Sequence, residues 1–240
     1  MATLLLHFAG LWQSWGTFGR FDNRPTDREP SKSGVLGVIC AALGVPRTED
    51  PLPYRLLSMG VRTDQIGSVT TDYQTSGYGG IAKSSSTKKK IVLGKNCVIS
   101  NREYLTDSVF LVGIEGDRHI LSKIQEALKD PVWPISLGRR NCIPSVPIYL
   151  KDGLIDKPLV EALSEYPWLG ITRWGQELPK QLRLSIESNH GIYRRDQLVG
   201  SFASQKFGLR QIESKWIQNP TTDEETQDVD FFKPGSSQSL

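Results

Sequence analysis

Residues 109–131 read VFLVGIEGDRHILSKIQEALKDP, a strand that leads directly into a helix. The apolar run Val109–Ile114 is typical of a buried strand, which Gly116 ends. Asp117 is a good helix cap and Pro131 a stop, so a helix is predicted between them. The apolar positions of this helix fall on one face: Ile120, Leu121, Ile124 and Leu128. The stretch therefore predicts mixed α and β structure.

The residues before this unit contain a comparable series of elements. Thr3–Phe8 is a short apolar run that predicts a first strand. Ser31 or Ser33 is expected to cap a helix that runs through Leu43, with Gly44 as its C-terminal stop. A short helix and one or two strands are predicted next, at Pro53–Met59 and Val61–Tyr73.

A long insertion separates these strands from residue 109. Gln74–Asn96 holds four glycines, a serine run and five lysines, with no acidic residue. We expect a protruding β-hairpin at about residues 74–98, called the thumb below. Its lysines, Lys83, Lys88, Lys89, Lys90 and Lys95, are either a grip on a nucleic-acid backbone or a solvated loop. With the thumb as an insertion, the element order of residues 1–130 fits a ferredoxin-like (RRM-like) α+β domain.

Residues 131–217 predict a smaller, β-rich C-terminal region. A helix is expected at Pro158–Tyr166, and the expected strands are Leu182–Glu187, Gly191–Tyr193 and Lys206–Ile217. Residues 218–240 contain five acidic side chains and one basic one, which predicts a flexible acidic tail. Because the net charge is +3, residues 1–217 alone carry +7, which modestly favours a polyanionic partner.

The composition also bears on where the protein works. No apolar run is long enough for a transmembrane helix, so no membrane partner is expected. The N-terminus lacks the features of a secretory signal. The three cysteines, Cys40, Cys97 and Cys142, are scattered and odd in number, which favours a reducing cytoplasm over a disulfide framework.

Catalytic and cofactor signals are weak. The three histidines, His7, His119 and His190, are far apart in sequence, and each fits a packed or solvent-facing side chain. No cysteine spacing suggests zinc, and the nucleoside triphosphate loop motif is absent. We therefore expect no cofactor, no metal and no catalytic residue.

Three segments are candidates to bind a polyanion. The tryptophans of the loop Ala9–Gly19 fit either base stacking or anchoring to the core. Ser31–Gly34 opens a helix, where backbone N–H groups bind anions, but it also fits an ordinary cap with glycines for close packing. Gly138 is followed by two basic residues, Arg139 and Arg140. Their side chains fit either bidentate phosphate contacts or a structural salt bridge.

Together these segments resemble the CasD family, which binds the 5′ handle of the guide RNA in the type I-E CRISPR Cascade complex. The resemblance rests on HFAGLWQSWG at residues 7–16, REPSKSGVLG at 28–37 and LGRRNC at 137–142. Asp72–Gln74 before the thumb and Glu103–Asp107 also match the family. The similarity covers nearly all of residues 3–217 in the family's order.

The resemblance implies a non-catalytic subunit that caps the crRNA 5′ handle and contacts the neighbouring backbone subunit and the large subunit. Target DNA would be met only indirectly, through the complex. The residues expected to bind RNA are Gln13, Ser14, Trp15, Gly16, Arg20, Arg24, Lys32, Ser33, Gly34, Tyr73, Lys83, Lys88, Lys89, Lys90, Arg139 and Arg140.

Two alternatives remain open at this point. A metal-independent endoribonuclease, like the type I-C relative, would need a base and an acid, for which Tyr73, Lys83 and one histidine are candidates. No Lys-His pair appears in the sequence. A scaffold that contacts only proteins would make the basic surface incidental.

Overall fold

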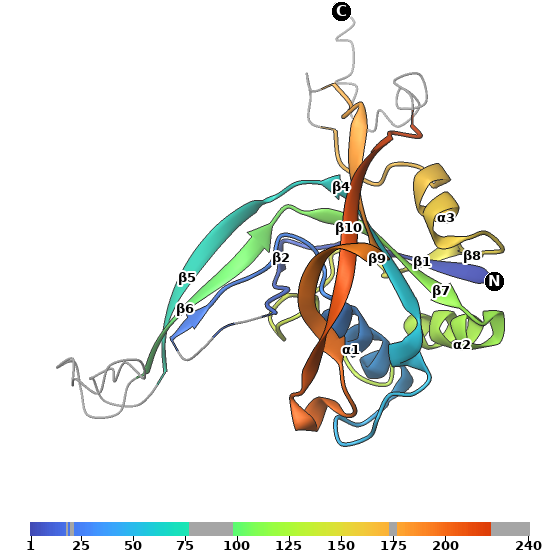
Figure 1. Cartoon of the computed structure of the whole chain (residues 1–240). Coiled ribbons are helices and arrows are strands. Elements are labelled where there is room, and N and C mark those ends of the chain that lie inside the picture. Colours follow the sequence, from blue (N-terminus) through green and yellow to red (C-terminus); the bar gives the residue numbers. More distant parts are fainter. Residues whose placement is uncertain (18, 20–21, 77–97, 173–176, 222–240) are drawn as a thin grey trace, which may run out of the picture.

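The protein folds as mixed α and β structure, as the sequence predicts. The computed structural model describes residues 1–17, 19, 22–76, 98–172 and 177–221 (Figure 1). Its elements, with short 3-10 turns labelled η, are β1 (Ala2–Ala9), β2 (Trp12–Gln13), β3 (Asn23–Arg24), α1 (Lys32–Leu43), η1 (Tyr54–Leu56), β4 (Ser58–Gln65), β5 (Ser68–Ser76), β6 (Val98–Thr106), β7 (Val109–Gly116), α2 (Arg118–Lys129), β8 (Tyr149–Ile155), α3 (Leu159–Glu165), β9 (Gln181–Leu198), η2 (Phe202–Ser204) and β10 (Phe207–Gln218).

A six-stranded antiparallel sheet forms the body of the molecule, in the order β10-β9-β4-β7-β1-β8. The C-terminal strands β9 and β10 join the same sheet as the N-terminal ones, through the pairing of β9 with β4. The two strands expected at Leu182–Glu187 and Gly191–Tyr193 are parts of one long strand, β9. Its partner β10 crosses the whole body (Figure 1).

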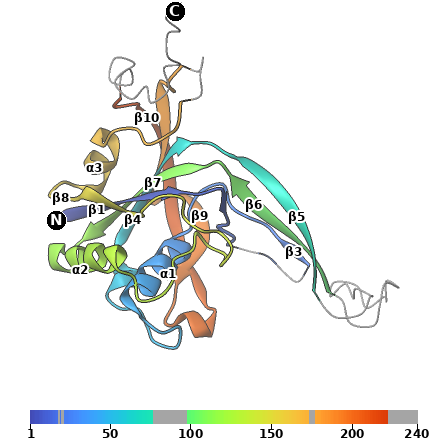
Figure 2. The same ribbon diagram turned by 180° about the vertical axis from the view of Figure 1, so that it is seen from behind.

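Alternation along β1 distributes the core between the two faces of this sheet. Leu4, Leu6 and Phe8 pack against α1 and α2, whereas Leu5 faces α3 on the other side. All four side chains have no exposed surface, and each such burial contributes about 2 kcal/mol. Helices therefore cover both faces of the sheet (Figures 1 and 2).

Helix ends follow the predicted caps. Of the two serines proposed, Ser31 caps α1: its Oγ accepts a hydrogen bond from the Gly34 N–H at 3.3 Å. Gly44 ends α1 with φ 72°. Asp117 caps α2 by accepting from two backbone N–H groups, at 3.0 and 3.2 Å. These contacts confirm the predicted starts of both helices.

The helix predicted at Pro53–Met59 is wrong except for one short turn, η1. Ser58 already begins β4, which pairs with β7 on one side and β9 on the other. Hydrogen bonds to two neighbouring strands favour extended backbone over a helix that could satisfy only its own groups. Only the last two residues of the predicted helix, Ser58 and Met59, belong to this central strand of the main sheet.

A second, smaller sheet forms a ribbon that curves away from the body (Figure 2). Its strands β5 and β6 pair from Ser68 with Thr106 to Ser76 with Val98, so the hairpin starts earlier than the predicted thumb. The short strands β2 and β3 flank β6. Five of the predicted RNA-binding residues lie outside the described residues: Arg20, Lys83, Lys88, Lys89 and Lys90.

Within the part of the chain that is described, no helix is both long and apolar enough to cross a bilayer.

Candidate nucleic-acid interface

Two adjoining hollows lie at the base of the β5–β6 ribbon. The larger, of about 800 Å³, is bounded by the Ser14–Gly19 loop, the start of α1 and the turn between β9 and β10. The smaller, of about 480 Å³, lies between β5, β6 and the turn at residues 138–141. Three residues line both hollows: Arg24, Gly138 and Arg139. The hollows therefore form one continuous depression.

We call this depression the arginine groove, after the five arginines that line it: Arg24, Arg47, Arg102, Arg139 and Arg140. Of the residues that the structure describes, no aspartate or glutamate lines either hollow. Arginine binds phosphate through two parallel hydrogen bonds and stacks on flat rings. The groove has the charge and shape expected for a polyanion with aromatic bases.

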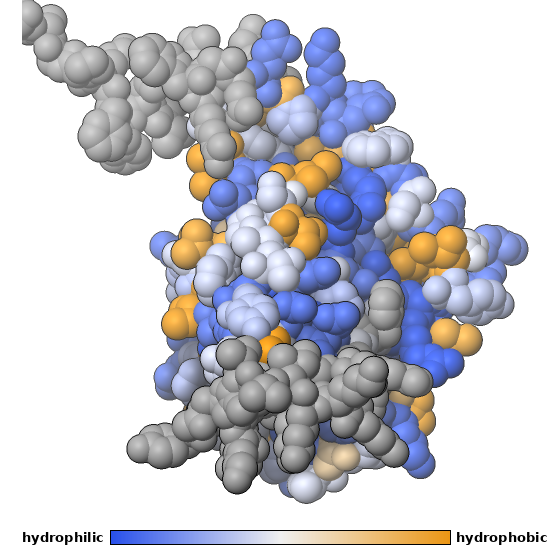
Figure 3. Space-filling view, turned by 90° about the vertical axis from the view of Figure 1, so that its left-hand side faces the viewer, coloured by the Kyte–Doolittle hydropathy of each residue, from blue (hydrophilic) through white to orange (hydrophobic). Residues whose placement is uncertain are grey.

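The side of the molecule from which the ribbon projects has a similar character. It presents mostly hydrophilic side chains, with apolar ones only scattered among them (Figure 3). A hydrophilic surface of this kind suits a charged, hydrated ligand better than a large apolar partner.

The tryptophan loop is held from inside the protein. Trp15 is 1% exposed and stacks on Phe8 with ring centroids 5.5 Å apart. Its indole N–H donates to Gln13 Oε1 at 3.0 Å, and Gln13 Nε2 donates to the Ser108 carbonyl at 2.7 Å. Both side chains are buried in the core, although Trp15 also lines the larger hollow, and RNA binding by Gln13 and Trp15 stays a prediction. They support the backbone of Ser14 and Gly16, which lines the larger hollow.

Glycines let three segments meet around this loop. Gly138 has φ 97°, and a Cβ there would lie 1.8 Å from the Ser14 carbonyl oxygen. At Gly34 a Cβ would lie 2.8 Å from the Trp15 ring. The turn at Gly138 and the start of α1 can thus pack directly on the tryptophan loop. The packing interpretation of Gly34 holds, and Gly34 also lines the hollow.

Lys32 does not line the groove. Its ammonium pairs with Glu187 at 2.7 Å, and its backbone N–H donates to Asp196 Oδ2 at 2.8 Å. Only 8% of the residue is exposed. Both partners lie in β9, and the role of the Lys32 side chain in binding RNA stays a prediction. Its neighbours Ser33 and Gly34 do line the larger hollow, together with Ser31.

Arg139 connects the turn at residues 138–141 to the ribbon. Its guanidinium donates to the Glu103 carbonyl at 2.9 Å and the Arg24 carbonyl at 2.6 Å, and lies 4.7 Å from the centre of the Tyr104 ring. These partners are neutral, so the positive charge is not cancelled. Arg139 is thus partly structural, as one interpretation of the sequence held, although its partners are carbonyls and not carboxylates.

The arginines next to Arg139 in the groove make fewer contacts within the described part of the protein. Arg24 and Arg140 are exposed and make no ion pair with the residues that the structure describes. Arg102 lies beside Arg24 because β3 and β6 pair in parallel register. Sequence reasoning missed Arg47 and Arg102, since only the fold brings them to the groove and no local motif marks them.

Tyr73 occupies a different face of the ribbon. It is 59% exposed, but its neighbour Gln74 is the β5 residue that lines the smaller hollow. Successive side chains of a strand point to opposite faces, so Tyr73 points away from the groove. Tyr73 stays available to stack on a ligand, but not from within the groove.

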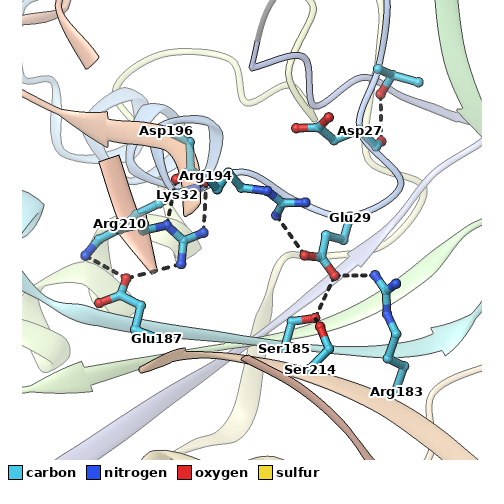
Figure 4. A network of polar contacts seen from close by, with 11 residues as sticks. Asp27, Glu29, Lys32, Arg183, Ser185, Glu187, Arg194, Asp196, Arg210 and Ser214 are labelled. Atoms are coloured by element: carbon cyan, nitrogen blue, oxygen red, sulfur yellow. Dashed lines mark hydrogen bonds and ion pairs between the residues drawn. The ribbon is translucent and has the colours of Figure 1, made fainter. Parts of the chain in front are cut away.

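A buried ionic network supports the groove from the C-terminal side (Figure 4). Glu29, 2% exposed, pairs with Arg183 and with Arg194, the latter at 2.7 Å, and accepts from Ser185 Oγ at 2.9 Å. A second group joins Asp196 to Arg210 at 2.6 Å. These contacts fasten the segment before α1 to β9 and β10.

Asp27 lies beside this network with its Oδ2 buried and without a hydrogen bond to a described residue. Burial raises the pKa of its carboxyl, and the nearby carboxylates of Asp196 and Glu29 add to the effect, while Thr17 and Arg194 oppose it. The protonated form of Asp27 is therefore favoured by folding.

Nucleophilic and metal chemistry find little support in the geometry. Burial raises the pKa of the Cys40 thiol to about 12, so the thiol stays protonated at neutral pH. Burial also lowers the pKa of His7, whose Nε2 has no partner among the described residues. Across the described ranges, no group of three histidines, cysteines or acids could hold a metal ion.

Comparison with known proteins places the chain in a family. The family model described as CRISPR-associated protein (Cas_Cas5) matches residues 3–213. The chain belongs to this family. All five arginines of the groove, and the network behind it, fall within the matched residues of the Cas_Cas5 chain.

Individual relatives agree with this assignment. The chain is 33% identical over 167 residues to "CRISPR system Cascade subunit CasD" of Escherichia coli (strain K12), which covers 61% of this chain and 69% of the relative. A solved structure entitled "Crystal structure of Cas protein" is 37% identical, with a TM-score of 0.71, and covers 91% of this chain and 100% of its own. Another, "CRISPR RNA-guided surveillance complex", is 29% identical with a TM-score of 0.71 and covers 91% of each chain.

Proposed function

We propose that this Cas_Cas5 chain is the CasD-type subunit of a type I-E CRISPR Cascade complex, where it binds and caps the 5′ handle of the crRNA. In this role it supports crRNA-guided binding of foreign DNA in antiviral defence. The observation that carries the proposal is the arginine groove, five arginines without an acidic side chain among its described lining residues. Its support from relatives is the Cascade subunit name of the Escherichia coli protein.

The groove favours single-stranded RNA for two reasons. Its two hollows extend over several side chains, from Arg47 past Arg24 to Arg140, which suits a chain of phosphates better than one small anion. Sequence-specific proteins read RNA mainly from unstacked single strands, whose bases can enter such hollows. Ser33, Gly34 and the backbone of Ser14–Gly16 would form the wall against which the handle lies.

The topology also supports a ferredoxin-like, RRM-like core. In chain order β1, α1, β4, β7, α2 and β8 follow the pattern βαββαβ, and their strands are ordered β4-β7-β1-β8 in the sheet. In this interpretation the β5–β6 ribbon is the thumb inserted between β4 and β7. The lysines that lie between β5 and β6 in sequence, Lys83 and Lys88–Lys90, would then contact the RNA.

The remaining parts of the proposal concern partners. The subunit would contact the neighbouring backbone subunit and the large subunit, and would meet target DNA only through the complex. It would act in the cytoplasm without a cofactor. Because the subunit would bind RNA as part of the complex, the amount of RNA retained by the assembled complex is the measurement that tests this role.

We propose a non-catalytic role because the candidate groups for RNA cleavage lie on separate elements. Tyr73 is on β5 and points away from the groove, while His7, His119 and His190 lie on β1, α2 and β9. Metal-independent cleavage needs a base and an acid at one phosphodiester. Incubation of the pure protein with precursor crRNA checks this, and specific cleavage without metal would establish the endoribonuclease alternative.

The groove is tested by reversing two of its exposed charges, Arg24 and Arg140. Arg24→Glu/Arg140→Glu should lower crRNA retention at least about tenfold, because each lost charge-assisted contact contributes roughly 1.5 kcal/mol or more. The full chain is coexpressed with the other Cascade subunits and a CRISPR array, and RNA per purified complex is quantified across a salt series.

A matched control changes the same charge elsewhere. Arg118→Glu/Lys123→Glu alters two basic residues of α2 outside the groove and should retain RNA as the unmodified protein does. Equal retention by the groove variant and the control would refute the proposed RNA path. A complex of the unmodified chain that carries no RNA would favour the scaffold alternative.

A further inference from the structure

The larger hollow contains aromatic residues that sequence reasoning did not select. Phe202, in the turn η2, and Phe207, the first residue of β10, line it together with residues of the tryptophan loop. Both are partly buried and pack against an apolar cluster of Leu36, Cys40 and Leu198. Each ring is thus fixed from behind while part of it faces the hollow.

This arrangement differs from that of Trp15, the other aromatic residue of the hollow. The Trp15 ring is 1% exposed and stacked on Phe8, so a ligand cannot cover it. The two phenylalanines offer apolar ring surface in a hollow whose other lining residues are mostly arginine, serine and glycine. A ring that packs on an apolar cluster with one side and faces a hollow with another is a suitable platform for a flat base.

Arg47 adds a charge to this end of the hollow. Its guanidinium carbon lies 5.9 Å from the centre of the Phe202 ring. Its carbonyl accepts a hydrogen bond from the Ala203 N–H at 2.8 Å, which ties the segment after α1 to η2. Within the described structure, Arg47 forms no ion pair, so its charge remains available for a phosphate.

We propose that Phe202, Phe207 and Arg47 form a base-binding subsite for one unstacked nucleotide of the guide RNA. The base stacks on a phenylalanine ring, and the guanidinium of Arg47 contacts the adjoining phosphate. The larger hollow, about 800 Å³, has the size of pockets that hold small organic ligands, roughly 300–1,000 Å³. This inference rests on the proposed function and names the part of the groove where a base is bound.

The subsite is tested with 2-aminopurine, whose fluorescence falls when it stacks. The full chain is reconstituted with the other Cascade subunits and synthetic guide RNAs that carry 2-aminopurine at one handle position at a time. We expect one position to be quenched in the unmodified complex and released in Phe202→Leu or Phe207→Leu. Loss of the stacking contact should weaken the binding of that RNA about tenfold.

Conservative and independent variants separate stacking from folding. Phe202→Tyr keeps a ring and should keep the quenching, while leucine keeps only the apolar packing. Arg47→Gln changes an exposed side chain outside the apolar cluster. It should weaken RNA binding several-fold without lowering the thermal unfolding temperature. Tyr193→Leu removes a 68% exposed ring outside the groove and should change nothing.

The outcomes distinguish the subsite from the groove. If Arg24→Glu/Arg140→Glu releases RNA but Phe202→Leu, Phe207→Leu and Arg47→Gln behave like the unmodified protein, the subsite is refuted and the proposed function stands. Quenching that Tyr193→Leu abolishes as fully as Phe202→Leu also refutes it. If the unmodified complex holds no RNA, both proposals fail together.

Discussion

Several residues chosen for their chemistry instead hold their neighbours in place. Gln13 and Trp15 make one hydrogen bond to each other, and Lys32 is engaged by Glu187 and Asp196. What reaches the groove is the backbone and the small side chains beside them. In this protein the bulky residues of a binding motif thus shape the site from behind.

Asp27 gives a prediction for the pH dependence of stability. Its folded-state pKa is raised, mainly by burial, so the folded protein holds a proton that the unfolded chain has already lost. The stability that this proton provides is complete below the unfolded pKa and is lost as the pH rises through the folded pKa. Asp27→Asn should therefore gain stability relative to the unmodified protein as the pH rises.

Urea denaturation at a series of pH values from 4 to 8 measures this difference. We expect the free energies of unfolding of the two proteins to converge at the acid end and to separate toward neutral pH. A difference that is constant with pH, or that has the opposite sign, would contradict an ionisable Asp27 disfavoured by burial.

At the scale of elements, the groove is made where turns approach strands closely. No sequence pattern predicts where the turn at residues 138–141 lies. In the structure it packs against Ser14 and brings Arg139 into contact with the ribbon. The Ser14 N–H donates to the Leu137 carbonyl at 3.0 Å, which adds a strand-like contact. The two hollows adjoin because the backbone of this turn lies close to the backbone of Ser14, and no continuous sequence motif produces this contact.

Gly138→Ala tests this approach. A Cβ would lie 1.8 Å from the Ser14 carbonyl oxygen, and φ is 97°, so the turn must move. We expect a loss of at least about 2 kcal/mol in the free energy of unfolding, together with weaker RNA retention. Chemical denaturation measures the first effect and RNA per complex the second.

Gly200→Ala is the matched control, because Gly200 also has positive φ, 72°, but no atom lies within 4 Å of the place that an added Cβ would take. It should cost only about 1 kcal/mol and leave RNA binding unchanged. If the two variants are equally stable, the contact of Gly138 with Ser14 does not determine the position of the turn.

At the scale of the whole molecule, residues near the N-terminus pair with residues near the C-terminal end of the described chain. Glu29 precedes α1, whereas its partners Arg183 and Arg194 lie in β9. The strand β9 itself pairs with β4 in the centre of the main sheet. The N-terminal wall of the groove and its C-terminal wall are thus joined by charge as well as by the sheet.

Glu29→Gln should destabilise the protein by about 3 kcal/mol, because two arginines that face a buried carboxylate lose their counter-charge. Asp156→Asn removes one partner of an exposed pair with Arg118 and should cost less than about 1 kcal/mol. Urea denaturation of both variants gives the comparison. Similar values for the two variants would show that the network contributes no more than a surface ion pair.

The sequence predicted local structure better than side-chain direction. Caps at Asp117 and Ser31, and the strand at residues 109–114, depend on neighbours in sequence and were predicted. Ser14, Gly16, Arg24, Ser33 and Arg139, chosen from separate motifs, line one hollow. The inward orientation of Lys32 and the contributions of Arg47, Phe202 and Phe207 depend on the packing of β9 and β10, which no local pattern encodes.

The position of β10 also has a consequence in time. The turn before it and its first residues supply Phe202, Phe207 and Arg210, yet they are among the last described residues of the chain to be synthesised. A nascent polypeptide that has only its first 180 residues outside the ribosome has one wall of the depression and lacks the other. The complete larger hollow should thus be available to the guide transcript only after the residues of η2 and β10 have left the ribosome.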